Sequence, residues 1–550
     1  GMEQLEGLLD GVDFTSLITA QLEQQYFKPS LQVIASQYTE YPALQAALWQ
    51  SSADTLFELG LYEPALEPQE LAIAQRRKLF GDHAQATLES LASKARLLAS
   101  MDRTAEAAAL LDQTLENMRR YTGLDYPAAL DALATRSDIL NMEGQYPAAG
   151  RGLKEVAERS HQLYGAMHPR ALHADVVVAG TMSSSEAVPQ LRKALDGLIQ
   201  AVGPAHRYTV EATEELSWAL YGQRRLDEAT ALARQALQQR QEALGDGHPR
   251  VIQSQSRLAG LLGENLQFDE AVSLFRNAIA GAEELFGRHG QKVAIMRGNY
   301  GYTLWRQGQL VEAERETRFA ADTLKQLYGP DTPGESTYGS NLAAILLSMG
   351  RYPEARQFFQ ARISLLTDIR GNRILLAEAH EGMGQLLLAV GDASAACAQF
   401  EAGLEVLSDK RPAFEDIELK LEGALAYGQH RRDGDGAGLA RLDAVIEGQR
   451  GRNSTDVLDL IISLVHRAEI QNDLRNWDSA LASADEALKI TEERLPASHY
   501  FKAAVLTQRI RALTGLGRSA EATRALEAAR AVIRASPGLD PAYGRKLGQA

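Results

Sequence analysis

The chain has 550 residues, several times the usual domain length of about 100–200, so it is either a string of domains or a repeat array. Its 85 alanines against 17 prolines are typical of closely packed helices, and its 45% apolar and 23% charged residues argue against disorder. The net charge of −15 disfavours a general nucleic-acid binder, and the single cysteine, Cys397, excludes an internal disulfide framework and a cysteine-rich zinc site.

The first 41 residues are expected to form an N-terminal cap with two helices, one over residues 16–26 and one around residues 31–38. They lack the basic start and apolar run of a signal peptide. Gly1 before Met2 looks like a scar of tag removal, which leaves open that the chain is a piece of a longer protein. No apolar run reaches the ~18 residues of a membrane helix, so no membrane insertion is expected.

From residue 42 onward, a short phrase ending in alanine recurs about every 42 residues. It reads Gly-Gln-Tyr-Pro-Ala-Ala at 144–149, and we call the last alanine of each phrase the anchor. The anchors lie at 65, 107, 149, 187, 229, 271, 313, 355, 396, about 438, 480 and 522. Chance does not produce this spacing, so the chain is predicted to be one array of about twelve repeats.

A second phrase follows each anchor by about 16 residues, as in Leu-Gly-Asp-Gly-His-Pro at 244–249. Its glycine ends a helical stretch and is expected in the left-handed position after a helix, while the proline begins the next helix. Each repeat therefore holds two amphipathic helices, and a small residue twelve positions before the anchor lets them approach closely.

These features resemble the tetratricopeptide repeat (TPR) family, in the 42-residue variety typified by kinesin light chain. The small residue, the Gly-x-Tyr-x-x-Ala turn and the Leu-Gly-x-x-His-Pro link carry the resemblance, which covers residues 42–535. It implies an all-α fold: a right-handed α-solenoid superhelix of about twelve helix-turn-helix repeats, with the first helix of each pair lining the concave wall.

Two repeats depart from the pattern. In the fourth, irregular over 175–190, Thr-Met-Ser-Ser-Ser at 181–185 replaces the usual phrase, and the turn is expected to be four residues short. In the tenth, irregular over 430–440, Asp433 and Asp435 resemble the start of a calcium loop. The later carboxylates of such a loop are missing, so we expect a flexible turn. Residues 536–550 are expected to be a flexible C-terminal tail.

No catalytic motif occurs: the sequence has no phosphate loop, HExxH, GxSxG, CxxC or kinase HRD and DFG in register. The link histidines lie about a repeat apart, out of one another's reach, and the family uses this histidine structurally. They are His83, His168, His206, His248 and His289. Cys397 lies on a second helix, where a small buried side chain is expected. We therefore expect no enzyme activity, no cofactor and no metal.

The inner wall is the remaining candidate site. TPR proteins that hold peptides do so mainly through first-helix residues about 18, 15, 11 and 8 positions before the anchor. In the fifth and seventh repeats these positions supply the predicted partner-binding residues Trp218, Tyr221, Tyr302, Trp305, Glu211 and Glu214. The two aromatic pairs flank a repeat with small residues, which would suit an apolar anchor of a partner. The alternative is that these rings pack between adjacent repeats.

The acidic charge is unevenly distributed along the chain. The first 419 residues carry a net charge of −17, and residues 420–550 carry +2. Toward the N-terminus the same wall offers Asp54, Glu89, Asp131 and Asp138 against Arg96. An acidic wall favours a neutral or basic partner segment. The lysine and asparagine set with which TPR clamps hold a partner's terminal carboxylate is absent.

The sequence therefore predicts a non-catalytic protein–protein interaction scaffold that binds a partner peptide or helix in the concave groove, in the cytoplasm. An alternative comes from residues 41–66, which look like the opening repeat after the membrane helix in bacterial serine/threonine kinases. The chain would then be the sensing TPR part of a signalling kinase whose catalytic domain it lacks, placed outside the cytoplasm. The sequence does not specify an oligomeric state.

Overall fold

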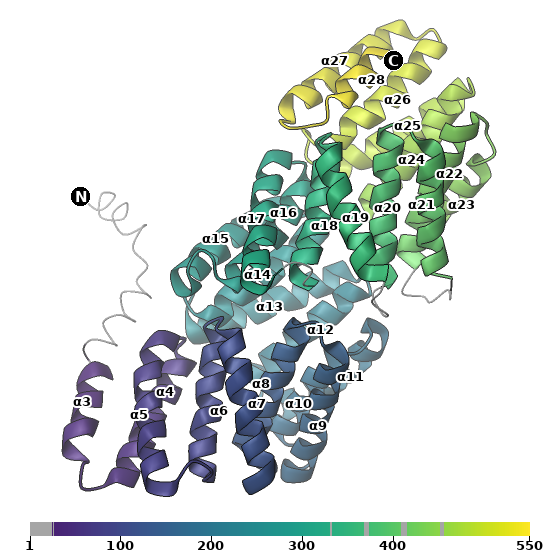
Figure 1. Cartoon of the computed structure of the whole chain (residues 1–550). Helices are drawn as coiled ribbons and strands as arrows, with labels where there is room; N and C mark the ends of the chain where they lie inside the picture. The colour runs from purple at the N-terminus through teal and green to yellow at the C-terminus, as the bar shows by residue number, and fades with distance from the viewer. Residues whose placement is uncertain are drawn as a thin grey trace, which may run out of the picture. The chain divides into compact units, whose positions relative to one another are not determined.

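The computed structural model describes residue 25 and residues 27–329, 333–367, 373–408, 415–451 and 456–549. Over these residues the chain is an array of helices, α3 to α28, without strands, as the sequence predicted (Figure 1). The helix expected around residues 31–38 is present as α3 (Lys28–Gln37), and the one expected over 16–26 lies outside the described residues.

The helices alternate as the first and second helices of successive repeats. The first helices are α4 (Pro42–Glu58), α6 (Gln85–Ser100), α8 (Pro127–Met142), α10 (Pro169–Ala179), α12 (Arg207–Gly222), α14 (Pro249–Glu264), α16 (Gln291–Gln307), α18 (Pro333–Ser348), α20 (Arg373–Ala389), α22 (Glu415–Asp433), α24 (Val457–Asp473) and α26 (Phe501–Gly515). The second helices are α5 (Tyr62–Phe80), α7 (Thr104–Tyr121), α9 (Tyr146–Tyr164), α11 (Ser184–Val202), α13 (Leu226–Leu244), α15 (Phe268–Phe286), α17 (Leu310–Tyr328), α19 (Tyr352–Thr367), α21 (Ala393–Val406), α23 (Leu439–Arg450), α25 (Trp477–Arg494) and α27 (Ser519–Ala535). A last short helix is α28 (Ala542–Gln549).

The chain packs as two compact units. Unit 1 contains the residues up to Leu258 together with Leu274–Val293, and unit 2 contains Ala259–Ser273 and the residues from Ala294 onward. Each unit has its own apolar core between first and second helices. In unit 1 this core includes Leu88, Leu111 and Met118, and in unit 2 it includes Leu386, Phe400 and Leu421.

Small residues let the two helices of a repeat approach closely. The anchor alanines from Ala65 to Ala480 are each at most 2% exposed. In the seventh repeat, a Cβ atom added to Gly301 of α16 would lie 2.2 Å from Thr317 Oγ1 and 2.9 Å from the Thr317 backbone nitrogen on α17. The approach of these two helices therefore requires a residue without a side chain.

Gly301→Ala is expected to destabilise unit 2 by about 1–3 kcal/mol, because the added methyl group meets backbone atoms that cannot move aside cheaply. The matched control is Gly260→Ala in α14, where the added Cβ would have no atom within 4 Å. That change is expected to stabilise the helix by about 0.5–1 kcal/mol, because alanine loses less backbone entropy than glycine. Thermal unfolding of both variants checks the prediction, and shifts of the same sign would contradict it.

The link glycines have the positive φ that was expected of them, but ψ at Gly81, Gly165 and Gly203 is 156–171°, which lies outside the left-handed helical position. Gly81, for example, has φ 88° and ψ 171°, a region open essentially to glycine alone. Positive φ is found at Gly81, Gly123, Gly165, Gly203, Gly245, Gly287 and Gly329. The eighth link glycine, Gly371, lies outside the described residues.

The irregularity of the fourth repeat lies in its first helix. Helix α10 has 11 residues, whereas α8 and α12 have 16 each. Four residues separate α10 from α11, against three between α8 and α9, so the turn is not the shortened part. The expectation of a short turn is corrected accordingly: the helix ends one turn early, at Gly180.

The C-terminal residues differ from the flexible tail that was expected for 536–550. Helix α28 packs through Leu547 into a core cluster with Leu481 and Leu506. The Asp540 carboxylate accepts a hydrogen bond of 2.8 Å from the Ala542 backbone N–H at the start of this helix. An eight-residue helix is not stable in isolation, so its order comes from tertiary packing that the repeat pattern does not report.

Candidate functional site

The first helices form the concave face of each unit. Successive first helices pack against one another, as α6 with α8 in unit 1 and α24 with α26 in unit 2. Among the described residues, no pair of successive second helices packs comparably. A row of hairpins whose first helices are closer together than its second helices must curve toward the first helices. We call this face, from about 8 to 18 residues before each anchor, the first-helix wall.

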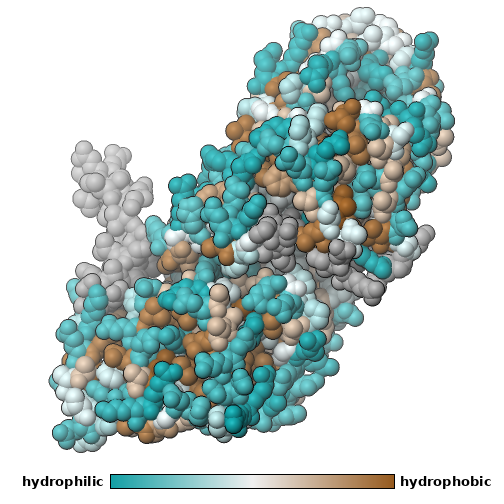
Figure 2. All heavy atoms as spheres, viewed as in Figure 1, coloured by the Kyte–Doolittle hydropathy of each residue, from teal (hydrophilic) through white to brown (hydrophobic). Residues whose placement is uncertain are grey.

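The face of the molecule drawn in Figure 2 shows no single large hydrophobic patch among the residues coloured there. Hydrophobic residues emerge there as small patches that are separated by hydrophilic ones. Scattered apolar residues of this kind are normal on a protein surface and mark no site.

In unit 1 the wall presents an aromatic pair on α12. The Trp218 side chain is 51% exposed, and its ring centroid lies 5.0 Å from that of Tyr221 with the planes tilted by 39°. Tyr221 itself is half-buried. The Trp218 indole is therefore available to a partner, which is the property that the groove interpretation requires of it.

The acidic candidate Glu211 is held by a neighbouring first helix. Its Oε2 atom lies 2.7 Å from Nε2 of His173 on α10, and the His173 ring stacks on Tyr208 at 4.2 Å. Burial opposes ionisation of this carboxyl, but the hydrogen bond and positive charge of His173 outweigh burial and lower the Glu211 pKa to about 2. Glu211 is therefore an ionised carboxylate on the wall, and one of its two oxygen atoms already contacts His173.

The second acidic candidate, Glu214, is only 5% exposed and makes a buried ion pair. Its Oε2 atom lies 2.9 Å from Arg240 Nη1 on the second helix α13, and its Oε1 atom accepts a hydrogen bond from Ser254 on α14. These contacts satisfy the carboxylate within the protein and join three helices. The geometry gives Glu214 a structural role that its position in the repeat did not reveal.

Two further carboxylates lie beside this wall. Asp138 on α8 is exposed, yet the surrounding protein desolvates it enough to raise its pKa to about 6, and repulsion from Glu215 adds to the shift. Glu215 lies over Gly180, where an added Cβ would be 3.4 Å from its Oε2 atom. Arg257 balances Glu215 through a contact of 2.8 Å, whereas no ion pair or hydrogen bond of Asp138 appears among the described residues.

In unit 2 the aromatic pair of α16 is tied to its neighbours. The ring centroids of Tyr302 and Trp305 lie 5.8 Å apart with the planes tilted by 54°. Trp305 Nε1 donates a hydrogen bond of 3.1 Å to Ser348 Oγ at the end of α18, and Arg306 Nη1 lies 3.4 Å from Tyr302 Oη. Trp305 thus packs between adjacent repeats, which was the alternative interpretation of these rings.

The two predicted aromatic pairs belong to different units, Trp218 and Tyr221 to unit 1 and Tyr302 and Trp305 to unit 2. The groove expected between them is not a single site of either unit. Partner binding by all six predicted residues stays a prediction, and Trp218 is the one whose surroundings fit it best.

Sequence reasoning missed the densest group of charges on the unit 2 wall. Lys420 Nζ on α22 lies 3.5 Å from Glu381 on α20 and 4.0 Å from Asp459 on α24. Burial raises the Asp459 pKa to about 6, although Lys420 opposes the shift. Lys420 occupies the position 18 residues before the tenth anchor, so the rule that selected Glu211 would have found it.

A stacked pair lies on the same part of the wall. The rings of Tyr427 and His466 are parallel to within 2° at 3.9 Å, and Tyr427 Oη donates a hydrogen bond of 2.9 Å to Glu469. Burial lowers the His466 pKa to about 4, so its imidazole is neutral near pH 7. The wall of unit 2 is therefore polar, and its charged and polar side chains largely pair with one another.

Three of the five predicted link histidines, together with His499 at the equivalent position of the last repeat, cap first helices, a structural role that agrees with the expectation for those three. In each case Nδ1 accepts a hydrogen bond of 3.1–3.2 Å from the backbone N–H two residues later, as in an N-cap. The residues concerned are His168, His206, His248 and His499. Because Nδ1 accepts this hydrogen bond, Nε2 is the ring nitrogen that is left to donate one.

A metal site, a reactive cysteine and a membrane-spanning helix are the remaining possibilities, and the described part of the chain supports none of them. No group of three or more His, Cys, Asp or Glu side chains there is arranged to hold a metal ion. Cys397 is buried as expected, and burial raises the pKa of its thiol, which opposes reactivity. None of the described helices combines the length and apolar character that a membrane crossing needs.

Comparison with known proteins agrees with this architecture. Residues 219–284 and 292–368 match the family model of the tetratricopeptide repeat. Two similar solved structures are of kinesin light chain TPR-like repeats from Podosopora anserina, the first of them a variant with one substitution. They are 19% and 20% identical, cover 37% of this chain and 97% and 99% of theirs, and each has a TM-score of 0.30. A third is BtubC (BKLC) from P. vanneervenii, which is 18% identical, covers 44% of this chain and 94% of its own, and has a TM-score of 0.32.

No curated protein matches the chain significantly. The family match spans the helices α13 to α19. Their pairing, buried anchors and link glycines also recur before and after them. The matched residues are tetratricopeptide repeats, and the same two-helix unit builds the α-solenoid on both sides of them throughout the described residues.

Proposed function

We propose that this tetratricopeptide array is a non-catalytic scaffold and that unit 1 binds a segment of a partner protein on its first-helix wall, at Trp218. The observation that carries the proposal is the exposed indole of Trp218 on the concave side of the array. A large aromatic ring left half-exposed on a wall that also carries charged and small residues is the usual anchor of a binding surface. Apolar burial against it would supply affinity without any catalytic group.

The proposed partner segment is neutral or basic. Asp138 lies near Glu215 on this wall, and within the described residues His173 offsets its charge only in part, so a lysine or arginine of the partner would relieve the cost of its desolvation. An acidic segment would meet repulsion from both carboxylates. The proposal therefore joins one apolar anchor to one basic side chain in the same short segment.

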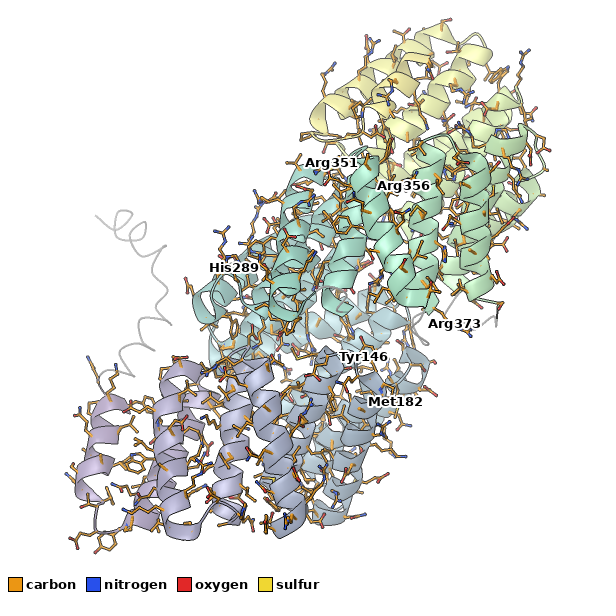
Figure 3. The ribbon with its side chains drawn as sticks, in the orientation of Figure 1. Tyr146, Met182, His289, Arg351, Arg356 and Arg373 are labelled. Atoms are coloured by element: carbon orange, nitrogen blue, oxygen red, sulfur yellow. The ribbon has the colours of Figure 1, made fainter. Side chains whose placement is uncertain are left out.

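Selection of a random peptide library against the full chain tests this function. Selected peptides are expected to be rich in lysine or arginine, and Trp218→Ala should weaken their binding by roughly 30-fold, as truncation of a hot-spot aromatic does. Tyr146 on the second helix α9, labelled in Figure 3, is also 51% exposed, so Tyr146→Ala is the matched control and should leave affinity unchanged. Affinity is measured by fluorescence anisotropy.

Equal affinity for the Trp218→Ala variant and the unchanged chain would contradict the site. Asp138→Asn separates the two parts of the proposal, since it keeps the anchor and removes one charge. It is expected to weaken basic peptides by a few-fold and to reduce the salt dependence of their binding. A set of selected peptides that is mainly acidic would contradict the charge argument while leaving the scaffold function intact.

A further inference from the structure

Turns of the array contact the starts of first helices five repeats later, and unit 1 shows this twice. His248 Nε2, before α14, lies 3.1 Å from the carbonyl oxygen of Glu58 at the end of α4. The neighbouring Gly60 faces Pro249 so closely that an added Cβ would be 2.5 Å from the proline ring. One repeat further on, the Lys292 backbone N–H donates a hydrogen bond of 3.0 Å to Asp102 between α6 and α7.

Unit 2 repeats the arrangement in the same register. His499 Nε2, before α26, lies 3.0 Å from the carbonyl oxygen of Arg306 at the end of α16. The Asp540 backbone N–H, before α28, donates a hydrogen bond of 3.1 Å to the carbonyl oxygen of Ser348 at the end of α18. We call these four contacts the latches: His248–Glu58, Lys292–Asp102, His499–Arg306 and Asp540–Ser348.

Closure after five repeats makes the concave side narrow. Five helices in a ring with axes about 8–10 Å apart lie about 7–9 Å from the ring centre. Side chains extend about 5–6 Å from a helix axis, so only a few ångströms remain along the centre. Small molecules and a single extended peptide strand reach such a wall more readily than a helix or a folded domain, which are wider.

Electrostatic contacts across the wall agree with this narrow geometry. In unit 2 the pKa of Lys420 is raised mainly by Glu381, with a smaller contribution from Tyr302, which lies three repeats earlier in the array. In unit 1 the carboxyl of Asp138 is exposed, yet the protein around it desolvates it. An accessible side chain surrounded closely by protein is what a narrow concave wall produces.

We propose that the latches gate the first-helix wall: closed latches exclude bulky molecules from it, and their opening lets the five-repeat turn spread so that a large partner can enter. The latches are few, polar and placed at helix ends. They can therefore open without loss of the apolar core that holds each helix pair together. The inference concerns access to the wall and goes beyond which partner binds there.

The histidine latches have an internal control in the chain itself. His206 caps α12 through Nδ1 as His248 caps α14, but the described residues contain no hydrogen-bond partner for its Nε2 atom. Asparagine is also a good helix N-cap, yet it is too short to reach the carbonyl oxygen of a distant turn. His248→Asn therefore removes the latch and keeps the cap, whereas His206→Asn changes a cap alone.

Cysteine labelling of the full chain tests the gate. Asp138→Cys places a thiol on the wall, and Ala105→Cys places one on the outer side of α7, where Ala105 is exposed. For each thiol, the rate with a polyethylene-glycol maleimide is divided by the rate with N-ethylmaleimide, which cancels the intrinsic reactivity of the thiol. In the latched chain this ratio is expected to be well below that at Ala105→Cys.

Adding His248→Asn is expected to raise the ratio at Asp138→Cys about fivefold, the effect of one lost hydrogen bond on an opening equilibrium. Lys292→Gln, which removes the ammonium contact of 3.0 Å with Asp102, should act in the same direction and guards against an effect peculiar to histidine. His206→Asn should leave the ratio unchanged. Circular dichroism identifies any variant that has unfolded.

Two results would overturn the gate. One is a ratio at Asp138→Cys equal to that at Ala105→Cys in the otherwise unchanged chain, because the wall would then be open with its latches closed. The other is an increase with His206→Asn as large as that with His248→Asn, because helix capping rather than the latch would then control access.

Discussion

Arg306→Ala is expected to destabilise unit 2 by about 3–5 kcal/mol, the loss that follows when one partner of a buried ion pair is removed. Arg306 is 4% exposed, and its Nη1 atom lies 2.5 Å from Asp456 at the start of α24. Its Nη2 atom lies 3.8 Å from Glu264 at the end of α14. Alanine would remove the Arg306 cation from beside two carboxylates in a poorly solvated place.

Hydrogen exchange resolved by helix is the measurement, because a chain with two compact units need not unfold in one transition. Faster exchange is expected in α16 and α24. The surface control is Arg518→Ala, whose exposed guanidinium pairs with Glu521 one turn away on the same helix, and no measurable change is expected there. Equal effects of the two substitutions would show that Arg306 contributes no more than a surface pair.

A double variant separates the charge from the packing. Arg306→Met with Asp456→Asn removes the guanidinium and the nearer of its two carboxylates and keeps the helix cap that residue 456 supplies, so it is expected to recover part of the stability that Arg306→Ala loses. If the double variant is as unstable as the single one, the loss comes from packing or from the Tyr302 contact instead of the unpaired charge.

Glu214→Ala is expected to cost unit 1 about 3–5 kcal/mol for the same reason, since it leaves Arg240 buried on α13 without its carboxylate. The loss should appear in the absence of any partner, as faster hydrogen exchange in α12 and α13. Glu211→Ala is the matched comparison on the same helix. Its side chain is half-exposed and pairs with the accessible His173, so a clearly smaller loss is expected.

The outcome decides what Glu214 does. A Glu214→Ala chain that is as stable as the unchanged chain and weaker only in partner binding would restore its predicted role on the binding surface. A stability loss without partner, together with unchanged affinity of the folded chain, would assign it to the join between α12, α13 and α14.

Most of the fold could be predicted because the residues that specify the helices and turns of a repeat lie within that repeat. The alanine anchors and the small position before them mark where two helices touch, and the link glycines occupy a backbone region that other residues avoid. The exceptions share a cause. Helix α28 and the early end of α10 depend on neighbouring helices, which a pattern within one repeat does not report.

The candidate site was only partly predictable for a related reason. Counting back from the anchor selects residues on the first-helix wall, and Trp218 is indeed exposed there. The same count cannot distinguish an exposed ring from one that contacts the next repeat, as Trp305 does through its hydrogen bond to Ser348. It also cannot distinguish a carboxylate that is available to a partner from one in an ion pair within the protein, as Glu214 is with Arg240. Those distinctions depend on residues from other repeats.

The sequence by itself determined the architecture of each repeat: two helices, their contact through small residues, and the turn and link between them. It did so because helix periodicity, burial and glycine conformations act within about 42 residues. Only the tertiary structure decided that the array closes after five repeats, where its latches lie and which wall charges pair. Curvature is the sum of small rotations from one hairpin to the next, so residues some 190 positions apart meet without any signal in the repeat itself.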